Sequence, residues 1–339
     1  MTTKEEVKAL WKLCFKDSDE FVDLYFEQRY KDEINVAIRR EGKVVSALQM
    51  IPYPMTFGGM TIETSYVSGA CTHPDYRKQG LMHQLLNEAH RRMYEEGVWL
   101  SMLIPAGKSL FNYYARSGYA PSFGYARQTV GVGELRPSLL FSVVDETDNR
   151  AFLYEHYRYL STCLQQCPCC VQHPREDFLI VMNDLRLSKG KLLVARRNGL
   201  IHGMAFCVEE QGKVVVKELL ADNLAVRDSL LHKAAEVFQV EKVEYMIPSS
   251  MNSLYLGMAR VINVEKMLAV VLRKYPEAQM YVHITGDEAI PENNGYFTIT
   301  QGNCIREHLT DKVYQECSIS DFTRLLLHIE HPYMSLMLN

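Results

Sequence analysis

The chain has 339 residues, enough for two or three domains. Its apolar share of 47% and charged share of 23% are ordinary for a globular protein, and its net charge of −4 argues against nucleic acid or an anionic membrane as the main partner. No apolar run approaches the length of a membrane span, and the opening MTTKEEVKALW is charged and amphipathic, unlike a signal peptide. We therefore expect a cytoplasmic protein with neither a nucleic-acid nor a membrane partner.

The first part of the chain predicts a mixed α/β domain. Two helices are expected within the first 33 residues, the first of them with a capping box formed by Thr3 and Glu6. Two hairpins follow, with turns at Glu41-Gly42 and Gly58-Gly59. The second hairpin leads into the strand ETSYVSGACT, and then come a helix, the buried strand VWLSMLIP, a short helix and a further strand. This order predicts one unit over residues 1–144.

The remainder predicts a second cycle and a smaller unit. A helical stretch leads to a hairpin over Asn198-Gly199, the strand KVVVKELLADN, a helix and the strand KVEYMIPSS. Because this order echoes the first unit, we expect a structural repeat over residues 145–254. Residues 255–339 predict a small α+β unit with an Asn-Gly turn between strands, ending in the apolar segment HPYMSLMLN. Solvated tails are usually polar, so we expect this one to pack against the protein.

The stretch from His73 to Met82, HPDYRKQGLM, lies between a predicted strand and a predicted helix. Such a junction leaves backbone N–H groups free at the start of the helix. Gly80 allows the backbone to approach a ligand, and Arg77 and Lys78 add positive charge. The stretch predicts an anion-binding turn, and the alternative is a basic turn without a ligand.

This stretch resembles motif A of the GCN5-related N-acetyltransferases (GNAT), whose signature is Arg/Gln-x-x-Gly-x-Gly/Ala. Arg77, Gly80 and Met82 occupy the three named positions, and Met82 departs from the small residue of the signature, as in the enhanced-intracellular-survival (Eis-like) subgroup. The segment YYARSGYAP, beginning at Tyr113, is similar to motif B of the same family. The order of the three units is also similar to that subgroup.

The resemblance implies a fold and an activity. It implies tandem GNAT folds over residues 1–144 and 145–254, the second without the pyrophosphate motif, and a sterol-carrier-protein-like (SCP2-like) unit over residues 255–339. It further implies an enzyme that moves an acetyl group from acetyl-CoA, as co-substrate, to a primary amine by direct transfer. The subgroup often forms trimers or hexamers, so the resemblance also implies a homo-oligomer.

Residue roles follow from the same resemblance. Backbone N–H groups from Ala70 to Thr72 would polarise the thioester carbonyl. Tyr114 falls on the tyrosine that protonates the leaving thiolate, and a phenol with a pKa of about 10 suits that task. The α-carboxylate of Asn339 falls on the general base of the subgroup, and an ordinary packed C-terminal strand is the alternative. The residues implied to contact coenzyme A are Ala70, Cys71, Thr72, Arg77, Lys78, Gln79, Gly80, Leu81, Met82 and Ser109.

The acceptor is open from the sequence. Acidic residues in the first two helices favour a cationic amine such as an aminoglycoside or a polyamine, but they also suit a solvated helix face. These residues are Asp17, Asp19, Glu20, Asp23 and Glu27. A protein lysine acetyltransferase and a non-catalytic protein that binds coenzyme A or an apolar ligand are the alternatives. An acetyl-cysteine intermediate on Cys71 is the alternative to direct transfer.

The nine cysteines are an odd number spread over the chain, which favours reduced thiols over a disulfide framework. Five potential metal ligands cluster in CLQQCPCCVQH, namely Cys163, Cys167, Cys169, Cys170 and His173. The cluster lacks the two paired C-x-x-C knuckles of a zinc site, and adjacent thiols suit one tetrahedral ion poorly. We therefore expect no metal.

Overall fold

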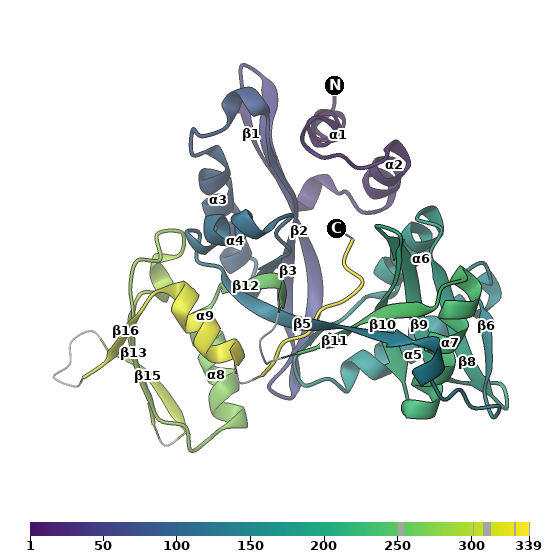
Figure 1. Ribbon diagram of the computed structural model, residues 1–339. Coiled ribbons are helices and arrows are strands. Elements are labelled where there is room, and N and C mark those ends of the chain that lie inside the picture. Colours follow the sequence, from purple (N-terminus) through teal and green to yellow (C-terminus); the bar gives the residue numbers. More distant parts are fainter. Residues whose placement is uncertain (250–253, 301, 308–312, 329, 339) are drawn as a thin grey trace.

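The computed structural model describes residues 1–249, 254–300, 302–307, 313–328 and 330–338, and Figure 1 shows three parts. A large sheet runs through two of them in the order β1-β2-β3-β4-β12-β5-β11-β10-β9-β8-β6, with β7 paired to β2. The third part has its own sheet in the order β15-β14-β13-β16. These are mixed α/β and α+β sheets, as expected. Among the described helices, none combines the length and apolar character needed to cross a membrane.

The helices alternate with the strands along most of the chain. The described α-helices are α1 (Thr3–Cys14), α2 (Asp19–Gln28), α3 (Leu81–Glu95), α4 (Lys108–Ala115), α5 (Leu153–Gln165), α6 (Arg175–Leu187), α7 (Leu224–Phe238), α8 (Val264–Lys274) and α9 (Ile319–His328). The described strands are β1 (Asn35–Arg40), β2 (Lys43–Phe57), β3 (Met60–Thr72), β4 (Leu100–Leu103), β5 (Ala120–Gly131), β6 (Ser142–Asp145), β7 (Cys170–Val171), β8 (Lys191–Arg197), β9 (Leu200–Glu210), β10 (Lys213–Ala221), β11 (Lys242–Pro248), β12 (Leu254–Val261), β13 (Met280–Ile284), β14 (Gly295–Thr300), β15 (Asn303–Glu307) and β16 (Gln315–Cys317).

The expected helices and hairpins of the first part form. The turn at Glu41-Gly42 joins β1 to β2, and the turn at Gly58-Gly59 joins β2 to β3. The capping box of α1 lies one residue earlier than expected, because Thr2 is the N-cap and Glu5 is its partner. Helices α1 and α2 cover one face of this sheet and α3 covers the other, since alternate side chains of β2 belong to two separate cores.

The second part repeats the order of the first. Strands β1, β2 and β3 pair antiparallel, α3 follows, and β4 then pairs parallel to β3. In the same way β8, β9 and β10 pair antiparallel, α7 follows, and β11 pairs parallel to β10. The hairpin between β8 and β9 turns at Asn198-Gly199, as expected. The described fold therefore contains the predicted repeat.

Strand β12 corrects the expected boundary at residue 255. We expected Leu254–Val261 to open the terminal unit, but it lies in the large sheet between β4 and β5 and runs antiparallel to both. Strand β5 joins the first two parts, because residues 120–125 pair with β12 and residues 125–131 pair with β11. The separate four-stranded unit therefore begins only after β12.

The third part packs on the first through a shared core. Helices α8 and α9 bury Met267, Leu268 and Phe322 in the cluster that also holds Trp11 and Tyr66. The segment Asn294-Gly295 does not form the expected tight hairpin turn, because β13 ends at residue 284 and a short 3₁₀ helix, Pro291–Asn293, intervenes. The part of the chain after β12, which we expected to resemble an SCP2-like domain, thus contains one small sheet and the helices α8 and α9.

The C-terminal tail, defined here as residues 332–338, packs against the protein as expected. Met334, Met337 and Leu338 are buried. Tyr333 forms a bridge beside β7, with its N–H donating to the Cys169 carbonyl over 2.9 Å and its carbonyl accepting from Val171 over 3.0 Å. Figure 1 shows this yellow segment running between the first part and α6.

Candidate functional site

A cation-rich turn joins β3 to α3. After a 3₁₀ turn at Pro74–Tyr76, Lys78 has φ 62° and Gly80 has φ 77°. Gly80 is the N-cap of α3 and brings no side chain to its free N–H groups. A Cβ placed on Gly80 would meet nothing within 4 Å, so open space lies beside the first turn of the helix. Such a helix start attracts an anion.

Three cations line this space without a carboxylate partner among the described residues: Arg77, Lys78 and Arg116. Arg77 donates from Nε to the Thr72 carbonyl over 3.1 Å, which orients its guanidinium beside the cavity, and its side chain also contacts the Cys14 thiol. Arg116, at the end of α4, lies in the segment that resembles motif B, but the sequence analysis gave it no role because only the packing of α4 shows that it reaches this space. Unpaired cations around a helix N-terminus fit the phosphates of a nucleotide co-substrate.

These groups surround a cavity of about 590 Å³. Its walls include most of the residues that the sequence selected, namely Ala70, Cys71, Thr72, Arg77, Lys78, Gly80, Leu81, Met82 and Tyr114. Two selected residues lie outside its walls. Gln79 is exposed and its side chain donates to the Asp75 carbonyl over 3.3 Å, and Ser109 is exposed on α4 because Leu110 and Tyr114 turn toward the cavity instead.

Strands β3 and β4 separate at this cavity. Their parallel pairing ends at Tyr66 and Met102, whereas β3 continues to Thr72. Gly69, with φ 61°, lies in a bulge of β3, and a Cβ there would overlap the Trp11 ring of α1. Among the strands that the structure describes, none pairs with the edge of β3 beyond this point on the side of β4, and that edge includes Ala70 to Thr72. Backbone N–H groups on such an edge can bind a developing negative charge.

Tyr114 lies at the closed end of this cavity. It is 9% exposed, and its ring meets Tyr113 and Tyr119 edge-on. Burial, together with the nearby Tyr113 and Cys71, raises its pKa to about 12. A phenol with this pKa stays protonated at neutral pH, so it can donate but not act as a base.

Two thiols also meet beside the cavity. Cys14, the last residue of α1, donates to the Thr72 carbonyl over 3.4 Å and also contacts Cys71. The Cys71 thiol and the Arg77 guanidinium lower the pKa of Cys14, whereas the interaction with Cys14 and burial raise the pKa of Cys71. Cys71 is therefore a protonated thiol at neutral pH.

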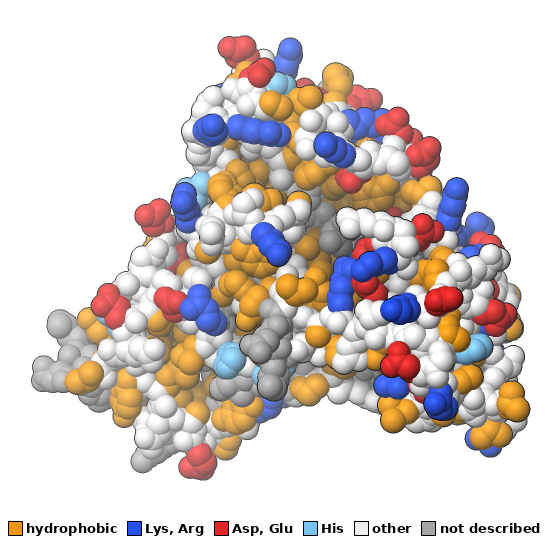
Figure 2. Space-filling view, in the orientation of Figure 1, with side chains coloured by type: hydrophobic (Ala, Val, Ile, Leu, Met, Phe, Trp, Pro, Cys, Tyr) orange, Lys and Arg blue, Asp and Glu red, His pale blue; other side chains and the backbone are white. Residues whose placement is uncertain are grey.

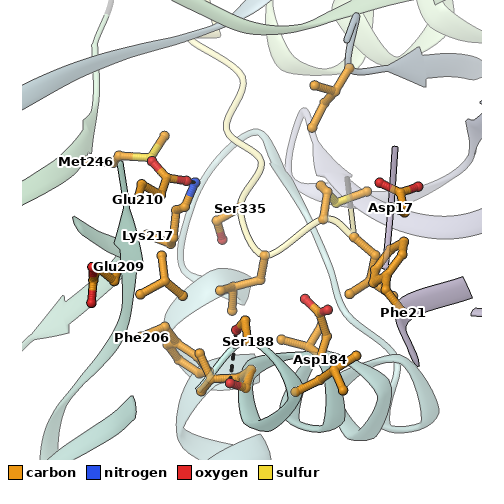
Figure 3. Close-up of a pocket in the computed structure, with 18 of the residues that line it drawn as sticks. Asp17, Phe21, Asp184, Ser188, Phe206, Glu209, Glu210, Lys217, Met246 and Ser335 are labelled. Atoms are coloured by element: carbon orange, nitrogen blue, oxygen red, sulfur yellow. Dashed lines mark hydrogen bonds and ion pairs between the residues drawn. The ribbon is translucent and has the colours of Figure 1, made fainter. Parts of the chain in front are cut away.

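A second cavity, of about 460 Å³, lies between the first two parts and the C-terminal tail. Figure 2 shows a hollow flanked by charged side chains of both signs where the first two parts meet, and Figure 3 shows the residues of the cavity. Ile104, just after β4, belongs to the wall of this second cavity. The backbone of Ile104 also forms a hydrogen bond with the Tyr66 hydroxyl. Tyr66 also interacts electrostatically with Tyr114, so this one buried phenol interacts with a residue from the wall of each cavity.

Two carboxyl groups from different parts of the chain belong to the wall of the second cavity. Asp17 accepts from the indole of Trp11 over 2.7 Å, and Asp184 of α6 points its carboxyl group toward the tail (Figure 3). Burial raises the pKa of Asp184 to about 6. Sequence analysis missed Asp184, because only tertiary packing brings α6 to this place.

The other acidic residues of α2 do not line either cavity. Asp19 pairs with Lys12 over 2.6 Å and Asp23 pairs with Lys8 over 2.7 Å, while Glu20 and Glu27 are exposed. These four residues therefore form a solvated helix face, which was the alternative expectation from the sequence. Only Asp17 of the expected set belongs to a cavity.

Asn339 lies outside the described residues, so its proposed role as the general base stays a prediction. The tail is held up to Leu338 by buried polar contacts. His173 contacts the Ser335 carbonyl with Nε2 over 2.9 Å, and Tyr333 donates to Glu218 over 2.6 Å. The described tail thus ends in the wall of the second cavity.

Residues 2–122 match the family model of the acetyltransferase (GNAT) domain. This match covers the cation-rich turn and Tyr114 and supports an N-acetyltransferase enzyme. No curated protein that was compared matches the chain. Within the part of the chain that the structure describes, no group of three or more His, Cys, Asp or Glu side chains is placed to hold a metal ion.

Solved structures share the fold of nearly the whole chain. A conserved protein of unknown function from Enterococcus faecalis, called a probable N-acyltransferase, has 16% identity and a TM-score of 0.73, over 96% of this chain and 87% of that one. A GCN5-related N-acetyltransferase from Anabaena variabilis has 15% identity and a TM-score of 0.73, over 97% and 96%. Eis1 from Mycobacterium abscessus has 13% identity and a TM-score of 0.75, over 96% and 88%. At these identities the likeness concerns the fold.

Proposed function

We propose that the chain transfers an acetyl group directly from acetyl-CoA to a primary amine of a cationic small molecule, of the aminoglycoside or polyamine kind. The observation that carries the proposal is that Tyr114 lines a cavity whose three cations have no carboxylate partner among the described residues. A second cavity carries four carboxyl groups and one cation, Lys217, which is paired with Glu210. The first suits a polyanionic co-substrate and the second suits a cationic acceptor.

The cation-lined cavity supports the binding of acetyl-CoA. Arg77, Lys78, Arg116 and the first turn of α3 would hold its phosphates, and the free edge of β3 from Ala70 to Thr72 would polarise the thioester carbonyl. Gly80 is suited to this role because the space beside it is open. We keep Gln79 and Ser109 as proposed contacts of an extended co-substrate, since both are exposed beside the cavity.

In the proposed reaction, the nitrogen of a neutral amine attacks the thioester carbonyl, and the bond from carbon to sulfur breaks. Tyr114 gives its proton to the departing sulfur, and the attacking nitrogen loses a proton to a base. That base is proposed to be the α-carboxylate of Asn339, directly or through water. The raised pKa of Cys71 argues against an acetyl-cysteine intermediate, because a protonated thiol is a poor nucleophile.

The acid-lined cavity supports a small cationic acceptor over a protein lysine. Its volume of about 460 Å³ is within the range of ligand pockets, and it is closed on one side by the C-terminal tail. Asp184 has no ion pair or hydrogen bond to its carboxylate among the described residues, so it is available to a second amine of the acceptor. A protein lysine acetyltransferase and a non-catalytic binding protein remain the alternatives.

The experiment is thiol release from acetyl-CoA with a panel of acceptors: a polyamine, an aminoglycoside, a monoamine and a lysine peptide. We expect turnover with the first two and little with the last two. Turnover with the lysine peptide alone would favour the protein acetyltransferase. If no amine is acetylated and coenzyme A does not bind, the proposed function is wrong.

The cytoplasmic location is proposed from the features of the sequence, and the homo-oligomer and the SCP2-like character of the terminal unit are proposed from the family resemblance. Size-exclusion chromatography with light scattering tests the oligomer, and thermal stabilisation by a fatty acid tests ligand binding in the terminal unit. Either result leaves the acyl-transfer proposal standing.

A further inference from the structure

The cysteine cluster between α5 and β7 has no part in the proposed reaction. Two of its members, Cys167 and Cys170, have the spacing C-x-x-C in the segment Cys-Pro-Cys-Cys. This segment follows the C-terminal end of α5 and enters β7. Pairs of thiols with this spacing are a common form of redox-active site in proteins that form disulfides reversibly.

The backbone of this segment is held closed by one hydroxyl group. Thr56 of β2 donates from Oγ1 to the Cys167 carbonyl over 2.7 Å, and the same oxygen accepts from the Cys170 N–H over 2.9 Å. Because both groups bond one atom, the carbonyl oxygen of Cys167 and the amide nitrogen of Cys170 lie less than about 6 Å apart. This closed backbone turn brings residues 167 and 170 toward each other, as an intrachain disulfide requires.

The two thiols face each other. Each thiol is close enough to shift the pKa of the other, and both are free in this structure, with the Cys167 sulfur also 3.7 Å from the Cys163 carbonyl. Cys167 is half-buried, whereas Cys170 is fully buried and also contacts the Val171 carbonyl over 3.3 Å. In such a pair the accessible thiol reacts with a small disulfide in solution. The buried thiol then attacks the resulting mixed disulfide and closes the intrachain bond.

The protonation of the pair agrees with this division. The hydrogen bond from Cys170 lowers the pKa of Cys167 to about 7, against the opposing effects of burial and of the Glu218 carboxyl group. The same interaction and burial raise the pKa of Cys170 well above its ordinary value. At neutral pH a substantial fraction of Cys167 is therefore thiolate while Cys170 stays protonated, and the thiolate is the reactive form.

The other thiols of the cluster do not share these properties. Cys163, on the last turn of α5, bonds Tyr159, and burial raises its pKa. Cys169 is 2% exposed, and burial raises its pKa as well. Both therefore serve as internal controls, because Cys163 lies four residues before Cys167 and Cys169 lies two residues after it.

We propose that Cys167 and Cys170 form a redox-active dithiol that reacts with low-molecular-weight disulfides and closes to an intrachain disulfide. The Cys167 thiolate attacks one sulfur of the small disulfide, forms a mixed disulfide and releases one small thiolate. The Cys170 thiol then loses its proton and attacks the Cys167 sulfur, which forms the intrachain bond and releases the second small thiolate. The protein loses two electrons and two protons, and the small disulfide is reduced to two thiols.

The position of the pair places this chemistry under the C-terminal tail. Cys169 and Val171, which flank Cys170, make the two backbone hydrogen bonds that dock Tyr333. Closing the disulfide would therefore act on the strand that holds the tail, although the proposed redox reaction does not depend on acyl transfer.

The experiment equilibrates the reduced full chain with glutathione buffers of increasing oxidised fraction. Each sample is quenched with acid, denatured and alkylated, and its peptides are mapped by mass spectrometry. We expect Cys167 and Cys170 to become protected from alkylation together. The peptide that holds them should then lack two alkyl groups and two hydrogens relative to the reduced peptide, while Cys163 and Cys169 stay alkylated. The thiols Cys14 and Cys71 lie on other peptides and do not interfere.

Variants resolve the two steps. In Cys170→Ser the reaction should stop at a glutathione adduct on Cys167, in Cys167→Ser no adduct should form at this site, and Cys163→Ser should behave like the unchanged chain. Thermal melting of each variant reports folding, and the unchanged chain gives the result without any variant. Alkylation of both Cys167 and Cys170 across all buffers, or a glutathione adduct on the unchanged chain that never closes, would overturn the proposal.

Discussion

The imidazole Nε2 of His173 lies 2.9 Å from the carbonyl oxygen of Ser335. Through this contact the segment before α6 holds the C-terminal tail in the wall of the acid-lined cavity. The other ring nitrogen faces Asp177, which also accepts from the Tyr53 hydroxyl over 2.8 Å and pairs with Arg29. One buried polar network therefore ties together α2, β2, α6 and the tail.

The first prediction concerns this network. His173→Ala leaves the Ser335 carbonyl without its His173 partner and removes one of the three partners of Asp177, which keeps Arg29 and Tyr53. An unsatisfied buried group costs about 1–3 kcal/mol, and the lost imidazole leaves a cavity besides. We expect the free energy of unfolding to fall by about 2–5 kcal/mol, measured by urea denaturation, with faster hydrogen exchange in the tail. His202→Ala is the control, because His202 pairs with Asp222 at the surface over 2.8 Å and should cost under about 1 kcal/mol. Equal losses in both variants would contradict the role of His173.

The second prediction concerns the bulge of β3. In Gly69→Ala the new Cβ would overlap the Trp11 ring, and the backbone φ of 61° is unfavourable for a residue with a Cβ. Steric overlap and backbone strain therefore both destabilise the variant. We expect a loss of about 2–5 kcal/mol in the free energy of unfolding. Gly42→Ala is the matched control, because it has φ 77° and a Cβ there meets nothing within 4 Å. It should cost only about 1–2 kcal/mol, and a similar loss at both sites would rule out the packing of α1 as the cause.

The third prediction concerns the cation-rich turn. Arg77→Ala removes a guanidinium that the Thr72 carbonyl orients toward the cavity. We expect the Kd for coenzyme A to rise by about 10-fold, measured by calorimetry, and to depend less on salt. Arg158→Ala, which removes an exposed cation of α5, should leave the Kd unchanged. If both variants bind coenzyme A like the unchanged chain, the turn is a basic turn without a ligand.

The fourth prediction concerns pH. Burial raises the pKa of Asp184 to about 6, so this carboxyl becomes charged as pH rises through 6. Only the charged form attracts a cationic acceptor, and we expect the KM for a polyamine to fall between pH 5 and pH 7. Because the folded pKa is above the unfolded value of about 3.9, this residue makes folding less favourable as pH rises from about 4 to 6.

Asp184→Asn tests the same residue. It should remove that part of the pH dependence and raise the KM for a polyamine by about 10-fold at pH 7, with a smaller effect on a monoamine. Glu27→Gln is the control, since Glu27 is exposed and belongs to neither cavity. An unchanged KM in Asp184→Asn would remove Asp184 from the acceptor site.

Local signals predicted much of the fold. Glycine-containing turns located three hairpins, and the spacing from Arg77 to Gly80 located the turn before α3, because these features depend on residues close in sequence. The apolar pattern of Leu254–Val261 indicated a strand but not its neighbours, since pairing between β4 and β5 is a long-range choice. The expected terminal unit was therefore too long at its start.

The same distinction holds for the site. Tyr114 and the residues from Ala70 to Met82 follow motifs, and most of them line one cavity. Asp184 belongs to no motif, and Arg116 lies in the motif-B-like segment but without an assigned role. Both line a cavity only through the packing of α6 and α4. Ser109 lies on α4, which borders the cavity, but on the exposed face of that helix and not on the face toward the cavity. Residue spacing along the sequence does not show which face is buried.

The central claim is that Tyr114 protonates the departing thiolate. The direct measurement is kcat for an accepted amine in Tyr114→Phe and in Tyr113→Phe, with the Kd for coenzyme A measured for both. Tyr113 is the neighbouring phenol and is 36% exposed. We expect Tyr114→Phe to lower kcat by about 10²- to 10⁴-fold with the Kd kept, and Tyr113→Phe to stay within about threefold of the unchanged chain. A kcat in Tyr114→Phe equal to that of the unchanged chain would contradict the account.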